Sequence, residues 1–434
     1  MSLPFTNIHT HVFTSECVPD RFLRILPIPM VRKAPRIVKG IIDSKIGRGI
    51  IHGLFKALSK KNSDKRGELD KYIAFLDVGT DTSQLEVFRT ALAAGISFDP
   101  AVRIIGLTMN MDYMDSQPSK KQISFETQLE EVKGIKRYYP ANFFPFLGID
   151  PRHRAGMDLV NFAKPYFESG VSSPVGKIYP YFSGIKLYPA LGFFPFDPRL
   201  EEIYRYAEQH QLPVMTHCTR VGSQYIGNQI ENLIPDSPPM LNMAGNQDIK
   251  DSVEKRIKAY KENSWIKNSK IGNNDLACDL FGHPENYIPV LKMFPKLKFC
   301  LAHMGGSNEV IKSMDGDLAK IRQVDPLSWF EHIKIMMKNY PNLYTDISYT
   351  LSDFKDTNSK VFQETLNFLG TLVNSNDPVN KIRFGDRVLF GTDFFMTEQE
   401  RREPELYAIT KQNLATWWDT LGRQNTQQYL NQPI

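Results

Sequence analysis

The sequence predicts an α/β chain that folds as a (β/α)8 TIM barrel with two inserted cap segments, and three observations support this fold class. Eight short apolar runs recur along the 434 residues, helix-like sequence separates most of them, and most end in polar residues, Gly or Pro. Strands that alternate with helices favour a parallel sheet, and eight of them favour a closed barrel. In chain order the runs are FTNIHTH (5–11), VRIIGLTMN (102–110), FFPFLGID (143–150), FSGIKLYP (182–189), LPVMTHC (212–218), LKFCLAHMGG (297–306), NLYTDIS (342–348) and RVLFGTDF (387–394).

Helix-like segments between these runs would supply the outer layer of the barrel. The clearest are TSQLEVFRTALAA (82–94), DPRLEEIYRYAEQHQ (197–211) and PENYIPVLKMFP (284–295). In such a barrel the C-terminal ends of the strands form the active-site face. Polar residues at the ends of the eight runs are therefore the candidate functional residues.

Two connections are too long for a bare barrel. One covers residues of about 14–68, after the first run, and the other covers residues of about 219–280, after the fifth. Both would leave the barrel on its active-site face. We interpret them as caps over the pocket of a single domain that spans residues 1–434.

The net charge of +5 is unevenly distributed along the chain. Residues 32–66 contain eleven Lys or Arg and two Asp, a local net charge of +9, so the rest of the chain carries 5 − 9 = −4. One basic segment on a mildly acidic body is not the pattern of a nucleic-acid-binding protein. The positive charge of this segment would instead favour the binding of a small anionic substrate.

The same basic segment also has the spacing of a helix that lies on an anionic membrane, with apolar residues recurring from Ile37 to Leu58. Four glycines weaken such a helix, so we favour a cap packed on the barrel and expect no stable membrane association. No apolar run of about 18 residues occurs in the sequence, so we expect neither a membrane span nor a secretory signal. The four cysteines form no CxxC motif, which favours a reducing, cytoplasmic setting. The oligomeric state is left open, a homo-oligomer included.

Two histidines, His9 and His11, lie one residue apart in the first run. Side chains two apart on a strand share a face, so both would point into the barrel near its active-site end. The polar residues that end later runs are Lys186, His217, His303 and Asp393. Taken singly, a buried histidine is usually a hydrogen-bonded core residue, and an Asp after Gly-Thr is often a helix cap. Burying all six in one barrel mouth would be costly without a cation, so together they predict a divalent metal site.

This pattern resembles the amidohydrolase superfamily of metal-dependent barrel hydrolases. Its signature is HxH on strand 1, a lysine on strand 4 in some members, histidines on strands 5 and 6, and an aspartate on strand 8. The matching residues here are His9, His11, Lys186, His217, His303 and Asp393. The segments FPKLKFCLAHMGG and NLYTDISY are more similar to the amidohydrolase-related branch that includes aminocarboxymuconate semialdehyde decarboxylase. The resemblance covers strands 1 to 8 outside the two insertions.

The resemblance implies that one divalent ion is held by His9, His11, His217 and Asp393. Imidazole and carboxylate ligands favour Zn²⁺, and Fe²⁺ and Mn²⁺ suit them too. The ion would lower the pKa of a bound water towards about 7, and Asp393 would take the proton of that water and later pass it to the leaving group. His303 would act as a general acid or base, or would stabilise charge on a substrate oxygen.

Lys186 leaves the number of ions open. In the two-metal branch, which includes dihydroorotase and has a segment much like IKLYPA, a carboxylated lysine at this position bridges two ions. His303 would then also be a ligand, with His217, of the second ion. In the one-metal branch a basic residue here stays charged and pairs with the substrate. A lysine paired with a neighbouring acid is the third alternative, and we favour one ion.

Substrate contacts are expected from Lys186, Tyr188, Arg152 and Arg220. An arginine in either position could pair with a substrate carboxylate in bidentate fashion, or could be an ordinary surface residue. Asp346 is a candidate hydrogen-bond partner for a ligand histidine. Strand alternation is expected to turn Cys218 and Cys300 away from the site.

The function that we expect is metal-dependent hydrolysis of a C–N or C–O bond in an amide, cyclic amide or lactone. The first alternative is nonoxidative decarboxylation of a small unsaturated or aromatic acid. The second is a non-catalytic, metal-bound barrel that acts as a binding protein. The sequence does not identify the substrate.

Overall fold

The computed structural model describes the greater part of the chain. The described residues are 3–22, 78, 83–117, 119–120, 122–153, 158–172, 176, 178–220, 222–262, 273–315, 327–351, 359–375 and 383–431.

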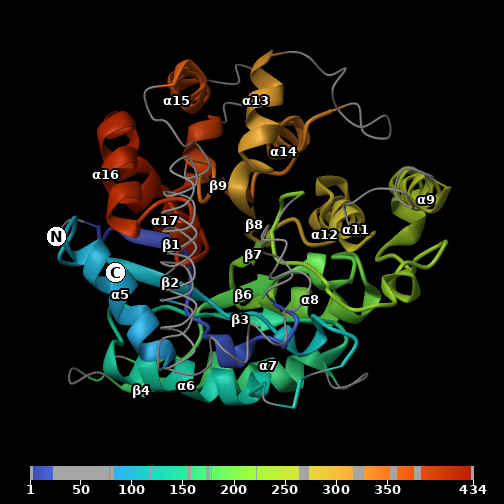
Figure 1. The fold of residues 1–434 in the computed structure, drawn as a ribbon, viewed down its shortest axis with the longest axis horizontal. Helices are drawn as coiled ribbons and strands as arrows, with labels where there is room; N and C mark the ends of the chain where they lie inside the picture. Colours follow the sequence, from blue (N-terminus) through green and yellow to red (C-terminus); the bar gives the residue numbers. More distant parts are fainter. Residues whose placement is uncertain are drawn as a thin grey trace, which may run out of the picture.

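Eight parallel strands form one sheet in the order β1-β2-β3-β6-β7-β8-β9-β10, and helices surround it (Figure 1). The sheet closes into a barrel because Ile8 N donates to Phe390 O at 3.0 Å and Asp393 N donates to His9 O at 2.9 Å. Each strand lies in one of the eight apolar runs, so the predicted barrel is confirmed. The strands are β1 (Thr6–His11), β2 (Arg103–Leu107), β3 (Phe146–Ile149), β6 (Gly184–Leu187), β7 (Val214–Thr216), β8 (Phe299–Leu301), β9 (Leu343–Asp346) and β10 (Val388–Leu389).

The helices begin where the sequence supplies capping side chains. Ser83 and Ser124 accept hydrogen bonds from the backbone N–H groups of Glu86 and Thr127, which satisfies donors that the first turn of a helix leaves free. The α-helices with described bounds are α5 (Gln84–Ile96), α6 (Phe125–Tyr138), α7 (Leu159–Glu168), α8 (Glu201–Gln209), α9 (Gln247–Glu262), α11 (Asn273–Gly282), α12 (Ile288–Met293), α13 (Ser307–Asp315), α14 (Trp329–Asn339), α15 (Lys360–Asn374), α16 (Glu403–Asn413) and α17 (Asn425–Leu430). A small antiparallel hairpin, β4 (Gly170–Ser172) with β5 (Ile178–Pro180), was not predicted.

Two clusters of buried apolar side chains build the barrel itself. The larger cluster joins the strands to the helices around them, and in it Phe5 stacks on Trp418 with ring centroids 4.2 Å apart. A second cluster draws buried side chains from strands all around the sheet, so it occupies the barrel interior. Its strand residues are Ile8, Ile105, Leu107, Phe146, Met215, Cys300, Tyr344 and Leu389.

An irregularity in β1 places the two histidines above this interior layer. Thr6 and Asn7 pair with consecutive residues of β2, but between Asn7 and Thr10 the chain gains one residue relative to its partner. Such a β-bulge breaks simple alternation. Ile8 can therefore join the interior cluster while His9 and His11 also point into the barrel mouth.

Only parts of the two long insertions are described. Residues 23–68, with the basic segment, lie outside the described residues, so their assignment as a cap stays a prediction. In the second insertion, Ile249, Val253 and Ile257 of α9 pack with Phe194 and Phe281 in a separate apolar cluster. Among the helices within the described ranges, none is long and apolar enough to cross a membrane.

Candidate active site

Three buried side chains converge where the barrel closes between β1 and β10. Oδ1 of Asp393 lies 3.4 Å from Nε2 of His9 and 3.2 Å from Nε2 of His11. One ligand atom from each of the three residues lies within 4.8 Å of the others. Two imidazoles and a carboxylate are the ligand types that a divalent transition metal prefers.

Asp346 determines which nitrogen of His9 is free to bind an ion. Its Oδ2 accepts a hydrogen bond from Nδ1 of His9 at 3.0 Å. The proton of the imidazole therefore sits on Nδ1, and Nε2 presents its lone pair towards Asp393. The expected role of Asp346 as a partner of a ligand histidine agrees with this contact.

The residues fit a metal ion because each has a buried polar atom that lacks a hydrogen-bond partner among the described residues. Among the described residues, no hydrogen-bond partner is found for His9 Nε2, His11 Nδ1 or Asp393 Oδ1. Buried polar atoms rarely stay unsatisfied in a folded protein. An ion held through His9 Nε2 and Asp393 Oδ1 would satisfy two of these three atoms.

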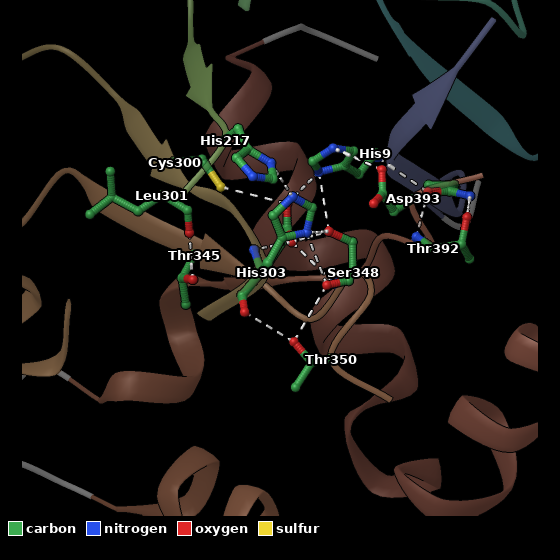
Figure 2. Close-up of polar contacts among 12 residues, drawn as sticks. His9, His217, Cys300, Leu301, His303, Thr345, Ser348, Thr350, Thr392 and Asp393 are labelled. Atoms are coloured by element: carbon green, nitrogen blue, oxygen red, sulfur yellow. Dashed lines mark hydrogen bonds and ion pairs between the residues drawn. The ribbon is translucent and has the colours of Figure 1, made fainter. Parts of the chain in front are cut away.

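A second potential metal-binding group, His9, His303 and Asp346, fits an ion less well. Ser348 and Asp346 already engage it: Oγ of Ser348 lies 2.8 Å from Nδ1 of His303 and 3.1 Å from Nδ1 of His9, and it donates to Oδ1 of Asp346 (Figure 2). The backbone N–H of His303 also donates to Oδ1 of Asp346, at 2.9 Å. These contacts form a hydrogen-bond network that holds the rings of His9 and His303 in position.

His217 stands outside the His9–His11–Asp393 group. Its Nδ1 lies 3.2 Å from Nε2 of His303, and its ring stacks on Tyr188 with centroids 4.5 Å apart. The structure thus brings together three of the four expected ligands and places the fourth against the expected acid/base residue.

Two of the site residues lie beyond the ends of their strands. His303 follows β8 in a short 3-10 turn with φ 67°, and Asp393 follows β10 with φ 65°. Because this left-handed backbone interrupts alternation, our expectation for Cys300 is wrong. Its side chain faces the barrel interior, with Sγ 4.0 Å from Oδ2 of Asp346. Cys218 instead packs in the outer core, near the carbonyl of Gly282.

Burial controls the protonation of the site. It lowers the pKa of His9 and of His303 well below the ordinary value, and other cationic groups such as Lys186 add to the effect. Burial also raises the pKa of Asp393, partly offset by His11 and Lys186. Without an ion, His9 and His303 would therefore be neutral, and the carboxyl group of Asp393 would hold its proton more tightly.

Lys186 projects from β6 into the site without a hydrogen-bond partner for Nζ among the described residues. It is 1 % exposed, and burial lowers its pKa to about 8. It also lines a small cavity with Asn110, Asp150, Tyr188 and Phe193. A buried amine that titrates near neutral pH can serve either as an ammonium or as a carbamate precursor.

The two expected arginines are engaged with acidic side chains. Arg152 forms a bidentate pair with Asp150 at 2.8 and 2.6 Å. Arg220 contacts Glu309 at 3.1 Å and Asp279 at 3.3 Å. A substrate would have to compete with these ion pairs.

An apolar shell covers the site. The ring of Phe13 lies 5.7 Å from that of His11 and 5.0 Å from that of Phe395. The other large side chains of this shell include Met109, Met111, Met114, Tyr188, Leu191, Ile226 and Phe394. Such a lining favours a substrate with an apolar or aromatic body.

Sequence reasoning missed two groups of supporting residues. Ser348 could have been found, because it lies two residues after Asp346 in the same run. The buried residues behind β1, Asn7 and Glu403, have no such signal, because 396 residues separate them in the chain.

Comparisons with known proteins agree with the fold. A sequence profile described as amidohydrolase matches residues 177–429, more than half of the chain. No curated protein matches the chain. A solved 5-carboxyvanillate decarboxylase from Novosphingobium aromaticivorans, complexed with manganese and 4-hydroxy-3-methoxy-5-nitrobenzoic acid, is similar with a TM-score of 0.51 and 12% identity, covering 99% of this chain and 96% of that one.

Two further solved structures are more distant. A 5-carboxyvanillate decarboxylase from Sphingomonas paucimobilis has a TM-score of 0.44 and 11% identity, covering 100% of both chains. An amidohydrolase from Burkholderia multivorans with bound zinc has a TM-score of 0.44 and 9% identity, covering 79% of this chain and 88% of that one.

Proposed function

Because this chain belongs to the amidohydrolase family, as its histidine pattern predicted, and is therefore an enzyme, we propose that it is a metal-dependent decarboxylase of small acids with an apolar or aromatic body. The observation that carries the proposal is Lys186. A buried cation with no hydrogen-bond partner among the described residues, beside a candidate metal group and under an apolar shell, is suited to a substrate carboxylate.

We infer that His9, His11 and Asp393 hold a single ion. His217 would become a fourth ligand of that ion after its ring rotates. Zn²⁺ remains the favoured ion and Mn²⁺ is compatible with the same ligands. The 5-carboxyvanillate decarboxylase with a similar fold was solved with manganese. When bound, a divalent ion would supply a Lewis acid that polarises a substrate oxygen.

The side chains of this protein would then bind the substrate and transfer the proton. Lys186, as an ammonium, pairs with the carboxylate that is to be lost, and the apolar shell excludes water around the rest of the substrate. When the bond to the carboxylate carbon breaks, CO2 leaves and the electron pair stays on the substrate carbon. That carbon takes a proton that Asp393 would first accept from a water molecule or from a hydroxyl group of the substrate and then pass on.

Hydrolysis of an amide, cyclic amide or lactone, which the sequence favoured, is the second candidate. The observation in its favour is Asp393 Oδ1, which is buried and has no hydrogen-bond partner in the described part of the chain. A carboxylate in that state can take a proton from an attacking water. The two candidate functions therefore use the same residues and differ mainly in the substrate that is converted.

Product analysis separates the candidates. The purified protein, reconstituted with Zn²⁺ or Mn²⁺, would be incubated with hydroxylated benzoates and small unsaturated acids, and in parallel with lactones and cyclic amides. We expect CO2 release, measured by gas-phase mass spectrometry, from at least one acid. Proton release in a pH-stat from a lactone, or a ring-opened product from a cyclic amide detected by mass spectrometry, without CO2 from any acid, would favour hydrolysis. No turnover across both panels would favour a binding protein.

A further inference from the structure

The side chain of Asn7 joins the two backbone segments that carry the candidate ligands. Its Oδ1 accepts the backbone N–H of His9 at 3.2 Å and the backbone N–H of Thr392 at 3.3 Å. Thr392 directly precedes Asp393, so one amide oxygen bridges a ligand on β1 to a ligand that follows β10. These two bonds lie at the bulge of β1, where the regular pairing with β2 is interrupted.

The amide nitrogen of Asn7 is held just as firmly. Nδ2 lies 2.8 Å from Oγ1 of Thr392, 3.2 Å from Oε1 of Glu403 and 3.2 Å from the hydroxyl of Tyr407. Oγ1 of Thr392 in turn donates to Oε1 of Glu403 at 2.7 Å. None of these four side chains is more than 3 % exposed. The orientation of the Asn7 amide is therefore fixed by Thr392 and by two residues of α16, Glu403 and Tyr407.

The segment before Asp393 also lies directly against His9. A Cβ atom placed on Gly391 would lie 2.8 Å from Cβ of His9 and 3.1 Å from Cβ of Ser348, so only glycine allows this approach. Figure 2 shows Thr392 and Asp393 beside His9. Asp393 itself has the left-handed φ of 65°, a conformation that a non-glycine residue keeps only when its surroundings hold it there.

We propose that Asn7, fixed by Thr392 and Glu403, is a positioning residue that sets the distance between His9 and Asp393 and thereby the metal affinity of the site. The inference rests on the proposed metal centre. It concerns residues that do not touch the ion or the substrate, and it assigns a function to a buried polar cluster that the reaction does not otherwise use. Residues that orient metal ligands typically change metal affinity by about 10–100-fold when they are removed.

Two substitutions and a matched control test the proposal. Asn7→Ala removes both bridging bonds, and Thr392→Val removes the hydroxyl while keeping the shape of the side chain. Thr392→Ser keeps the hydroxyl and is the control. The affinity for Co²⁺ is measured by competition with a chelator, the visible spectrum of bound Co²⁺ reports the ligand geometry, and thermal unfolding of the metal-free proteins reports the fold.

We expect Asn7→Ala and Thr392→Val to bind Co²⁺ about 10–100-fold more weakly with an altered spectrum, and Thr392→Ser to match the wild type. Wild-type affinity and spectrum in Asn7→Ala would overturn the proposal. If the wild type binds no Co²⁺, the metal centre itself is wrong. Hydrogen exchange of the backbone amides of His9 and Thr392 then tests the positioning role by itself. Faster exchange in Asn7→Ala would support that role, and unchanged exchange would refute it.

Discussion

Nδ1 of His217 lies 3.2 Å from Nε2 of His303, so His217 reaches the His9–His11–Asp393 group only through His303, whose ring centroid is 4.6 Å from that of His9. Nδ1 of His303 is 3.1 Å from the carbonyl oxygen of Ser348, which can only accept, so the proton of His303 sits on Nδ1. Its Nε2 then accepts a hydrogen bond from Nδ1 of His217. A Cβ on Gly222 would lie 2.9 Å from Nε2 of His217, so the backbone passes close to that side of the ring.

The first prediction concerns metal content. Wild-type protein should retain about one equivalent of a divalent transition metal, and His11→Ala should lose it, because the remaining ligands cannot complete a compact shell. Elemental analysis after gentle purification measures this. His210→Ala is the matched control, since it removes an exposed imidazole that packs on Tyr206. Equal metal content in wild type and His11→Ala would contradict the assignment.

The second prediction separates His217 from the other ligands. Because His217 lies outside the group of three, His217→Ala should weaken retention of the ion less than His11→Ala does. His303→Asn should retain it, since His303 is not a ligand in a one-ion site. Chelator competition on the three variants gives the order of affinities. Loss of the ion from His303→Asn would point to a second ion.

The third prediction concerns Asp393. An amide in its place fills the same volume but neither accepts nor delivers a proton, so Asp393→Asn should keep the fold and lose at least about 100-fold in turnover. Circular dichroism checks the fold, and rates are measured with saturating metal. A variant that turns over at the wild-type rate would remove Asp393 from the reaction.

The fourth prediction is a pH dependence set by Lys186. Burial, the largest cause, lowers its pKa to about 8, so the amine is charged below that pH and neutral above it. For an anionic substrate, KM should therefore rise as the pH passes upwards through about 8. In Lys186→Met this rise should be absent and KM should be high throughout. A flat KM profile in the wild type would exclude the ammonium as a carboxylate partner.

The neutral amine also allows the two-ion alternative to be tested. Carbamate formation needs an uncharged lysine, so bicarbonate should act above about pH 8 if it acts at all. We expect one equivalent of metal with or without bicarbonate. Uptake of two equivalents that needs bicarbonate and is abolished by Lys186→Met would establish a bridging carbamate and favour hydrolysis.

The fifth prediction concerns stability. Burial raises the pKa of Glu403 to about 8, above its ordinary value of 4.5. Between these values the folded state holds a proton that the unfolded state has released, so the free energy of unfolding should fall as the pH rises from about 4.5 to 8. Glu403→Gln cannot titrate and should become more stable relative to wild type across that window. Denaturant unfolding of the metal-free proteins at pH 5 and pH 8 measures the difference, and a constant difference would contradict the prediction.

The sequence by itself determined the barrel and most of its active-site face. Alternating apolar runs and helix-like segments are local patterns, so they locate strands and helices without knowledge of what packs against them. The ends of parallel strands meet on one face, which is why His9, His11, Lys186 and Asp393 could be grouped before any contact was known.

Only the tertiary structure decided the orientation of those side chains. Left-handed residues after β8 and β10 interrupt alternation, so the inward position of Cys300 and the pairing of His217 with His303 could not be read from spacing. Asn7 and Glu403 come from opposite ends of the chain, and their hydrogen bonds exist only because closure of the barrel brings β1 beside β10 and α16. The lowered pKa of Lys186 likewise follows from its burial, which depends on all the residues that surround it in the folded protein.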